Sequence, residues 1–377
     1  MVERRHLLVV TLALLASVAA VLMAGRPADG AASVPNGFES STVAGGLDRP
    51  TVMALAPGGG FFVAEQGGAV RVVREGRLLQ RPLLDLSGRV DSRGERGLVG
   101  LTLDPDFARD KPFIYVYYTL AARNGVPPHN VIARFRVDGD RILPGSGRRL
   151  ARLPNLNATN HNGGALAFGR DGRLYAAVGE NARPELAQNR NSRFGKMLRM
   201  NRAGKAPKDN PFYSNPRVKG VNKTVWALGL RNPYSFAIRP GTGTMFINDV
   251  GAAEWEEINR GVAGANYGWP VHEGPESDRR FRGPFYAYRH AAGTCNAITG
   301  GAFYDPRRAQ FPRGYVGDYL FADICRGFIR RVDPRTGEVR GFATGLSAPV
   351  DLKVGPDGVL YYLSRGTNSV ERIRYTG

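Results

Sequence analysis

The chain has 377 residues, of which 42% are hydrophobic and 23% are charged, and its 49 Gly and 25 Pro are spread along its length. This composition excludes a disordered chain, a collagen-like repeat and a long coiled coil, and it is ample for a large buried core. The 52 Lys and Arg outnumber the 33 Asp and Glu, which gives a net charge of +19. Because the basic residues are scattered, they predict a generally cationic surface that attracts anionic polymers, and they disfavour nucleic-acid recognition.

Residues 1–32 have the pattern of a signal peptide. Arg4 and Arg5 precede an uncharged apolar stretch at 7–25, and small residues follow at 28 and 30–32, with cleavage expected near 30–32. An uncleaved membrane anchor is the alternative interpretation, because an apolar stretch of this length can span a bilayer. The arginine pair is also compatible with twin-arginine export. We therefore expect a mature chain, 33–377, that is secreted, periplasmic or held at the cell surface.

The chain contains two cysteines, Cys295 and Cys325. An even number of cysteines in an oxidising compartment favours one disulfide, and two free thiols are the alternative.

Six copies of one pattern run along the mature chain, each an apolar strand, a tight turn and a second apolar or aromatic strand. We expect these strand pairs at 52–55 and 61–63, 99–103 and 114–117, 165–168 and 174–177, 235–238 and 245–247, 301–304 and 319–321, and 350–354 and 360–363. Turns at Asp171-Gly172, Thr242-Gly243 and Asp357-Gly358 supply the positive φ of tight hairpins. Several copies continue into a third strand, as at 69–73, 132–136 and 328–332. Such repeats predict an all-β, six-bladed β-propeller in a single domain.

Two further segments complete the predicted architecture. Residues 41–44 look like a strand and are expected to pair with the last blade and close the ring. Residues 185–224 are rich in Asn, Lys, Arg and Pro, and we expect them to form a surface loop.

Propeller geometry sorts the polar residues by face. The segment that leads into the first strand of each blade, and the loop between its second and third strands, open on one face beside the central channel. We expect this face to hold residues 95–97, 160–164, 179–181, 231–233 and 249–252, together with both cysteines. Hydrogen-bonding and charged residues thus converge on one face, whereas the Asp-Gly turns lie on the other.

His161 is the main catalytic candidate on this face. It leads into an inner strand, and two glycines follow it that let a ligand approach closely, although a lone histidine is often structural. Arg231 follows the apolar run 226–230, which would bury its stem. Its charge then requires an anion, a carboxylate or carbonyl dipoles.

The segment 249–266 contains acidic residues among small ones, namely Asp249, Glu254, Glu256 and Glu257. Carboxylates with loop carbonyls suit Ca²⁺, and solvated acids are the alternative. The sequence has no Gly-rich phosphate loop, no Cys/His metal spacing and no Gly-x-Ser-x-Gly motif. NAD, zinc and serine-hydrolase chemistry therefore have no support.

An ordered set of motifs resembles the soluble aldose sugar dehydrogenases that use pyrroloquinoline quinone (PQQ), also called glucose/sorbosone dehydrogenases. These motifs, within residues 47–375, are ERGLVGL at 95–101, DPDF at 104–107, HNGG at 161–164, GKMLR at 195–199, LGLRNP at 228–233, WEEIN at 255–259 and NYGWP at 266–270. The resemblance implies a six-bladed propeller, in agreement with the repeats. It also implies oxidation of a sugar at its anomeric hydroxyl to the lactone, with PQQ and Ca²⁺ as cofactors and an external electron acceptor.

The resemblance assigns roles to individual residues. His161 matches the family's general base, and Arg231 with Asn232 matches the pair that contacts the quinone. Glu95 and Glu180 fall at substrate positions, where the family has Gln and Asp.

The same resemblance implies two Ca²⁺ sites. The carbonyls of Gly251 and Ala252 match those that hold the cofactor's Ca²⁺. Glu257 and the carbonyl of Tyr267 match a second, structural site.

Three positions depart from the family's cofactor-binding pattern. The lysine that holds the quinone falls at Cys325, and an Arg-x-Arg that grips it falls at Ala348-Pro349-Val350. PQQ carries carboxylates, and burying them without cations is costly. A non-catalytic propeller that binds an anionic glycan, a cell-wall polymer or a protein is therefore the alternative, with a lactone hydrolase as a more distant one.

Overall fold

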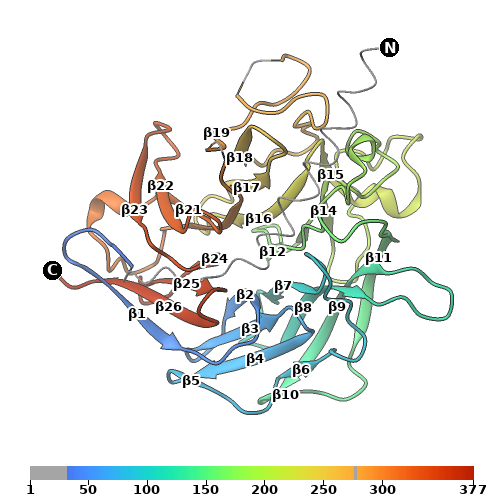
Figure 1. The fold of residues 1–377 in the computed structure, drawn as a ribbon. Coiled ribbons are helices and arrows are strands. Elements are labelled where there is room, and N and C mark those ends of the chain that lie inside the picture. The colour runs from blue at the N-terminus through green and yellow to red at the C-terminus, as the bar shows by residue number, and fades with distance from the viewer. Residues whose placement is uncertain (1–31, 276–277, 292) are drawn as a thin grey trace.

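The structure is a computed structural model that describes residues 32–275, 278–291 and 293–377. Strands dominate these residues, and the helical segments among them are three single turns, η1 (Pro184–Ala187), η2 (Gly220–Thr224) and η3 (Arg313–Tyr315). The strands form six antiparallel sheets that radiate as blades from a common centre (Figure 1). The predicted all-β, six-bladed propeller is confirmed.

Blades one to three are formed by consecutive parts of the chain. Blade one contains β2 (Pro50–Leu55), β3 (Phe61–Glu65), β4 (Ala69–Arg74), β5 (Arg77–Leu78) and β6 (Leu84–Asp85). Blade two contains β7 (Leu98–Leu103), β8 (Phe113–Leu120), β9 (His129–Asp138), β10 (Arg141–Ile142) and β11 (Arg148–Asn155). Blade three contains β12 (Leu166–Phe168), β13 (Leu174–Val178), β14 (Lys196–Met200) and β15 (Val225–Leu228).

Blades four to six continue in the same way, except that the last blade also takes a strand from the start of the chain. Blade four contains β16 (Asn232–Ile238), β17 (Met245–Val250), β18 (Trp255–Arg260) and β19 (Tyr286–Arg289). Blade five contains β20 (Ile298–Phe303), β21 (Tyr319–Asp323), β22 (Phe328–Val332) and β23 (Val339–Ala343). Blade six contains β24 (Pro349–Val354), β25 (Leu360–Ser364), β26 (Ser369–Tyr375) and β1 (Phe38–Ala44), which pairs antiparallel with β26.

The six predicted strand pairs are the first two strands of the six blades, with ends that differ by at most three residues. The first strands lie innermost and pack against one another around the axis in the order β2, β7, β12, β16, β20 and β24. The predicted turn glycines Gly172, Gly243 and Gly358 have φ of 66°, 79° and 79°, as their hairpins require.

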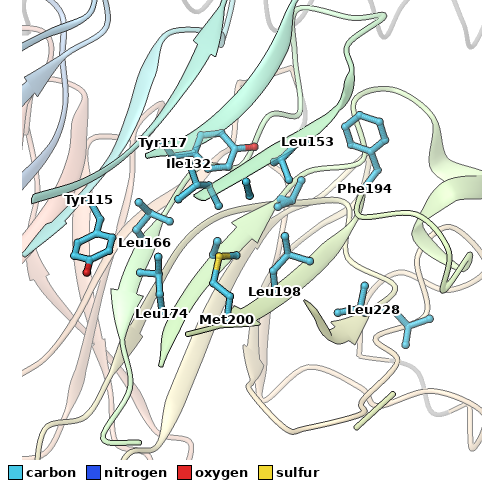
Figure 2. Packing of buried hydrophobic residues seen from close by; sticks show 14 of the residues in the cluster. Tyr115, Tyr117, Ile132, Leu153, Leu166, Leu174, Phe194, Leu198, Met200 and Leu228 are labelled. Atoms are coloured by element: carbon cyan, nitrogen blue, oxygen red, sulfur yellow. The ribbon is translucent and has the colours of Figure 1, made fainter. Parts of the chain in front are cut away.

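Apolar side chains between neighbouring blades form the core. Between blades two and three, Tyr117 and Ile132 meet Leu174, Leu198 and Met200, all of them fully buried (Figure 2). Burial of this kind is the main favourable term in folding, at about 25 cal/mol per Å² of apolar surface removed from water. The blades are therefore held by packing around the ring, and this packing fixes the loops at their ends.

The expectation of a surface loop at 185–224 is wrong, because the segment contains β14, the third strand of blade three. All five residues of β14 are buried. Lys196 makes the strand hard to recognise in the sequence, because a charged residue is not expected in a buried strand. Its ammonium is buried and donates hydrogen bonds to the carbonyls of Leu186, Ala187 and Phe194, at 2.8, 2.8 and 2.6 Å. A charged residue can lie in a core strand when its donors are satisfied in this way.

The predicted signal peptide, 1–32, lies outside the described residues except for Ala32. In the described part of the chain, no helix has the length and apolar character needed to cross a membrane.

Candidate active site

His161 and Glu180 form a pair on the face predicted to be functional. His161 precedes the inner strand β12, and Glu180 lies in the loop after β13, so both belong to blade three. Nδ1 of His161 is hydrogen-bonded to Oε1 of Glu180, and both side chains are buried. Nε2 of His161 has no hydrogen-bond partner among the described residues. The imidazole is thus oriented through one nitrogen, and the other is left to act on a ligand.

Two neighbours hold the backbone around His161. Its N–H donates to Oε2 of Glu95 at 2.8 Å, and its carbonyl accepts a hydrogen bond from the N–H of Asn181 at 3.1 Å. The buried hydroxyl of Tyr117 donates to the carbonyl of Asn162 at 3.0 Å, which connects this segment to the core between blades two and three.

Asn232 links blade four to this arrangement. Its Nδ2 lies 3.3 Å from Oε2 of Glu95, and its Oδ1 accepts a hydrogen bond from the N–H of Gly163 at 3.1 Å. The backbone carbonyl of the neighbouring Arg231 accepts a hydrogen bond from the N–H of Glu180 at 2.9 Å. The structure therefore brings Glu95, His161, Glu180, Arg231 and Asn232 together from blades two, three and four.

Arg231 is 6% exposed, and its positive charge has no carboxylate partner among the described residues. Nη1 donates to the carbonyl of Val250 at 3.1 Å, and the guanidinium lies 5.5 Å from the ring centroid of Trp269. Its backbone N–H, with that of Asn232, donates to the carboxylate of Asp249 at 3.0 and 2.7 Å. The arginine is thus held in place by its backbone while its charge remains available for an anion.

Several residues on this face have the left-handed backbone conformation that non-glycine residues rarely adopt. Arg49, His161, Asn181, Ala182 and Ala348 have φ between 45° and 56°. Each such residue costs about 1–3 kcal/mol, and such residues collect at binding and active sites.

The acidic residues of blade four lie in two groups. Asp249 and Glu257 are buried next to each other, and burial, with the charge of Glu257, raises the pKa of Asp249 well above its usual range. Burial also raises the pKa of Glu257, to which the charge of Glu273 adds. Glu256 lies apart from them and pairs with His290, at 2.8 Å between Oε1 and Nε2.

The backbone at the predicted calcium residues is compact. A Cβ added at Gly251 would lie 1.5 Å from the carbonyl oxygen of Trp255, and the N–H of Ala252 donates to Oε1 of Glu273 at 2.7 Å. Glu257 accepts hydrogen bonds from the N–H of Gly274 and from Asn259, at 2.7 and 3.0 Å. The N–H of Tyr267 donates to the carbonyl of Leu228 at 2.9 Å. Among the residues that the structure describes, no three His, Cys, Asp or Glu side chains converge as a metal site.

The positions that depart from the family's cofactor-binding pattern carry no charge here. Cys325 forms a disulfide with Cys295, with 5.4 Å between the Cα atoms, which confirms the predicted bridge. Val350 is 2% exposed and packs in an apolar cluster. Ala348 has φ of 49°.

Gln66 and Arg365 are two residues at this face that the sequence did not single out. Gln66 lies in the loop after β3, and its Nε2 donates to the carbonyls of Gly94 and Arg96, on either side of Glu95, at 2.7 and 2.8 Å. Arg365 lies in the loop after β25 and binds Oε1 of Gln66. Their place in loops between second and third strands was the available signal, but it does not show which side chains reach across the ring.

A cavity of about 720 Å³ runs along the axis between the inner strands. Thr51, Gly163, Tyr234 and Asp351 line it near the candidate site, and Pro105, Pro240 and Pro356 line its other end. His161 is not part of its lining, although Gly163 lies two residues further along the chain. The catalytic candidates therefore lie at the edge of the central channel.

Comparison with known proteins identifies the family. Residues 47–371 match the family described as Glucose / Sorbosone dehydrogenase. The aldose sugar dehydrogenase of Escherichia coli (strain K12) is 30% identical over 335 residues, covering 84% of this chain and 87% of that protein. The solved apo form of the soluble aldose sugar dehydrogenase from Escherichia coli has a TM-score of 0.78 at 26% identity, and the match covers 90% of this chain and 99% of that chain. The PQQ-bound aldose sugar dehydrogenase from Streptomyces coelicolor has a TM-score of 0.73 at 25% identity, covering 91% and 99%.

A six-bladed propeller with a histidine–carboxylate pair beside its channel, and with these relatives, belongs to the class of sugar dehydrogenases. The chain is a member of the glucose/sorbosone dehydrogenase family, so the predicted resemblance is confirmed.

Proposed function

We propose that the protein is an exported quinoprotein that oxidises the anomeric hydroxyl of an aldose to the lactone, with His161 as general base. The observation that carries the proposal is the buried His161–Glu180 pair, which is joined to the backbone of Arg231 through the N–H of Glu180 and which leaves Nε2 of His161 without a partner among the described residues. The family assignment, and the PQQ bound to a relative, support the choice of substrate and cofactor.

Glu180 prepares His161 for proton transfer. Its carboxylate accepts a hydrogen bond from Nδ1–H of His161, which leaves the lone pair on Nε2 for the sugar hydroxyl. When Nε2 takes the hydroxyl proton, the same carboxylate stabilises the imidazolium that forms. Glu180 is 1% exposed and also accepts a hydrogen bond from the N–H of Arg183. We therefore assign it the role of positioning His161, in place of the substrate contact that the resemblance implied.

The chain's own residues fit an anionic cofactor. The Arg231 guanidinium is buried without a carboxylate partner in the described residues, and a buried cation of this kind is stabilised by an anion. We assign Arg231 and Asn232 to hold the quinone. A bound PQQ would supply the acceptor for the hydride from the anomeric carbon, His161 would take the hydroxyl proton, and the two electrons would pass on to an external acceptor.

The blade-four acids fit a cation. Burial raises the pKa of both Asp249 and Glu257, and a neighbouring carboxylate adds to each shift, Glu257 for Asp249 and Glu273 for Glu257, so a divalent ion near them would relieve an unfavourable charge. We assign the carbonyls of Gly251 and Ala252 to the Ca²⁺ at the cofactor, and Glu257 with the carbonyl of Tyr267 to a second Ca²⁺.

Export is supported by the disulfide, because such bonds persist in oxidising compartments. The signal-like segment at 1–32 is the proposed route.

The test is reconstitution. Purified protein is incubated with PQQ and Ca²⁺, and dye reduction is followed with a panel of aldoses. The wild type should reduce the dye, and His161→Ala should lower kcat on the order of 10⁴-fold, because general-base catalysis contributes up to about that factor. Its circular dichroism should remain that of the wild type.

His129→Gln is the matched control, because it removes a buried imidazole that is bonded to the carbonyl of Pro127, outside the site. It should keep near wild-type turnover. A wild type that takes up no quinone and oxidises no sugar would overturn the proposal; salt-sensitive retention on anionic polymers would then support the non-catalytic alternative.

A further inference from the structure

Arg365 is a half-buried arginine on the same face as His161, on the opposite side of the ring. It directly follows β25, and its N–H donates to the carbonyl of Ala348 at 3.0 Å, so its backbone is fixed within blade six. Its side chain crosses to blade one, where Nη1 lies 3.0 Å from the carbonyl oxygen of Arg49 and 3.4 Å from that of Pro50. Nη2 donates to Oε1 of Gln66.

These partners are neutral oxygens. A guanidinium has five N–H donors, and Arg365 makes three side-chain hydrogen bonds, which leaves two donors without a partner among the described residues. Ion pairs occur elsewhere on this face, for example between the buried Arg96 and Asp91 at 2.7 Å. Within the described ranges, Arg365 has no carboxylate within ion-pair distance, and burial lowers its pKa. Its charge is therefore partly desolvated and not neutralised.

Arg365 is connected to the candidate site by a chain of hydrogen bonds. Gln66, which binds Arg365, also holds the carbonyls on both sides of Glu95, and Glu95 in turn holds the backbone of His161. Tyr234, on the inner strand β16, lines the cavity, and burial raises its pKa to about 12. The charge of Arg365 lowers this pKa, whereas those of Asp351 and Glu95 raise it, so Arg365 interacts electrostatically with Tyr234.

We propose that Arg365 binds a carboxylate of the ligand at the axial site, so that Arg231 from blade four and Arg365 from blade six form a two-arginine clamp around it. The proposal rests on the proposed function. The carboxylate is provided by the quinone cofactor or by an acidic sugar, and the arms of the experiment separate these sources.

Quinone binding to the full chain is titrated by absorbance, without sugar, for the wild type, Arg365→Gln and Arg365→Lys. With a cofactor carboxylate in the clamp, Arg365→Gln should weaken PQQ binding about 10–100-fold, because it removes a charge-assisted hydrogen bond. Arg365→Lys should recover part of the affinity, since it restores the charge without the planar fork. The wild-type affinity should fall more steeply with salt than that of Arg365→Gln, a difference that loss of packing alone would not produce.

The second arm uses thermal shift with D-glucuronate and D-glucose. With a sugar carboxylate in the clamp, the wild type should gain stability from glucuronate over glucose, and Arg365→Gln should lose that preference while it keeps wild-type quinone affinity.

Arg326→Gln is the matched control, because Arg326 is an exposed arginine in the equivalent loop of blade five, stacked on Phe328 at 5.4 Å. It should bind both ligands as the wild type does. Equal affinities in the wild type and Arg365→Gln for both ligands would overturn the clamp while leaving the proposed function intact, as would an equal loss in Arg326→Gln. A wild type that binds no quinone would overturn the proposed function, and the glucuronate arm would still decide the role of Arg365.

Discussion

The two sides of the axial face are constructed differently. On the side of blades two to four, Glu95, His161, Glu180 and Asn232 bind one another through side-chain and backbone hydrogen bonds. On the side of blades five, six and one, a disulfide and the apolar Val350 replace charged groups, and Arg365 is held by neutral oxygens. Each blade contributes its own loops, so one side of a propeller site can change while the other keeps its arrangement. Under the proposed function, proton transfer belongs to the side of blades two to four, whereas the proposed anion clamp takes one arginine from each side.

The largest effect that would sharpen this comparison is expected at Glu180. Glu180→Gln removes the negative charge that orients and stabilises the His161 imidazole, and we expect kcat to fall about 1000-fold. The pH dependence of kcat should change with it, whereas quinone affinity, measured by absorbance, should stay near the wild-type value.

Glu185→Gln removes a carboxylate from an exposed position in the same loop and should be silent. A Glu180→Gln variant with wild-type kcat and pH profile would show that the pair is only structural.

The disulfide gives the next effect, on the other side of the face. It closes a 30-residue interval, so replacing Cys295 and Cys325 with Ser should cost about 3–4 kcal/mol of stability on the loop-entropy account. Chemical denaturation would measure this loss, and kcat at a temperature where the variant is folded should be unchanged. Reductant should reproduce the loss in the wild type and have no effect on the variant; a fall in kcat of the folded variant would contradict the separation of the two sides.

The smallest effect is expected at Asp91, which fixes the blade-two side of the site. The hydrogen bond from Arg93, together with that from Arg96, holds the pKa of Asp91 well below its usual range. A carboxyl with a lowered folded-state pKa stabilises the fold above its ordinary pKa of about 4, and this contribution is lost as the pH falls below that value. Asp91→Asn should therefore cost about 2 kcal/mol at neutral pH, and less at pH 3.

Urea unfolding of both proteins across this pH range measures the difference. Asp140→Asn, which breaks the exposed pair with Arg74, should cost at most about 1 kcal/mol and serves as the control. A cost for Asp91→Asn that does not change with pH would show that the ion pair is not responsible.

The sequence was sufficient to predict the fold and the site residues that directly precede the inner strands. Period-2 apolar runs with Gly turns recur six times, and the residues just before an inner strand, such as His161 and Arg231, share a face by topology alone. Lys196 led to the wrong prediction of a surface loop, because a charged residue is not expected in a buried strand. Its donors are satisfied by carbonyls that only the folded structure brings close. Arg365 and Gln66 could not be found, because their partners lie across the junction between the last blade and the first.

The pairing of β1 with β26 has a consequence for how the protein reaches its folded form. Phe38 lies opposite Tyr375, so almost the whole length of the chain separates the two halves of this ladder. Closing so long a loop is entropically unfavourable and slow, and it cannot begin before β26 has been synthesised. Until the last strand arrives, β1 and β25 each present an unpaired edge that can recruit other chains, so the interval before ring closure is when the nascent protein is most prone to aggregate.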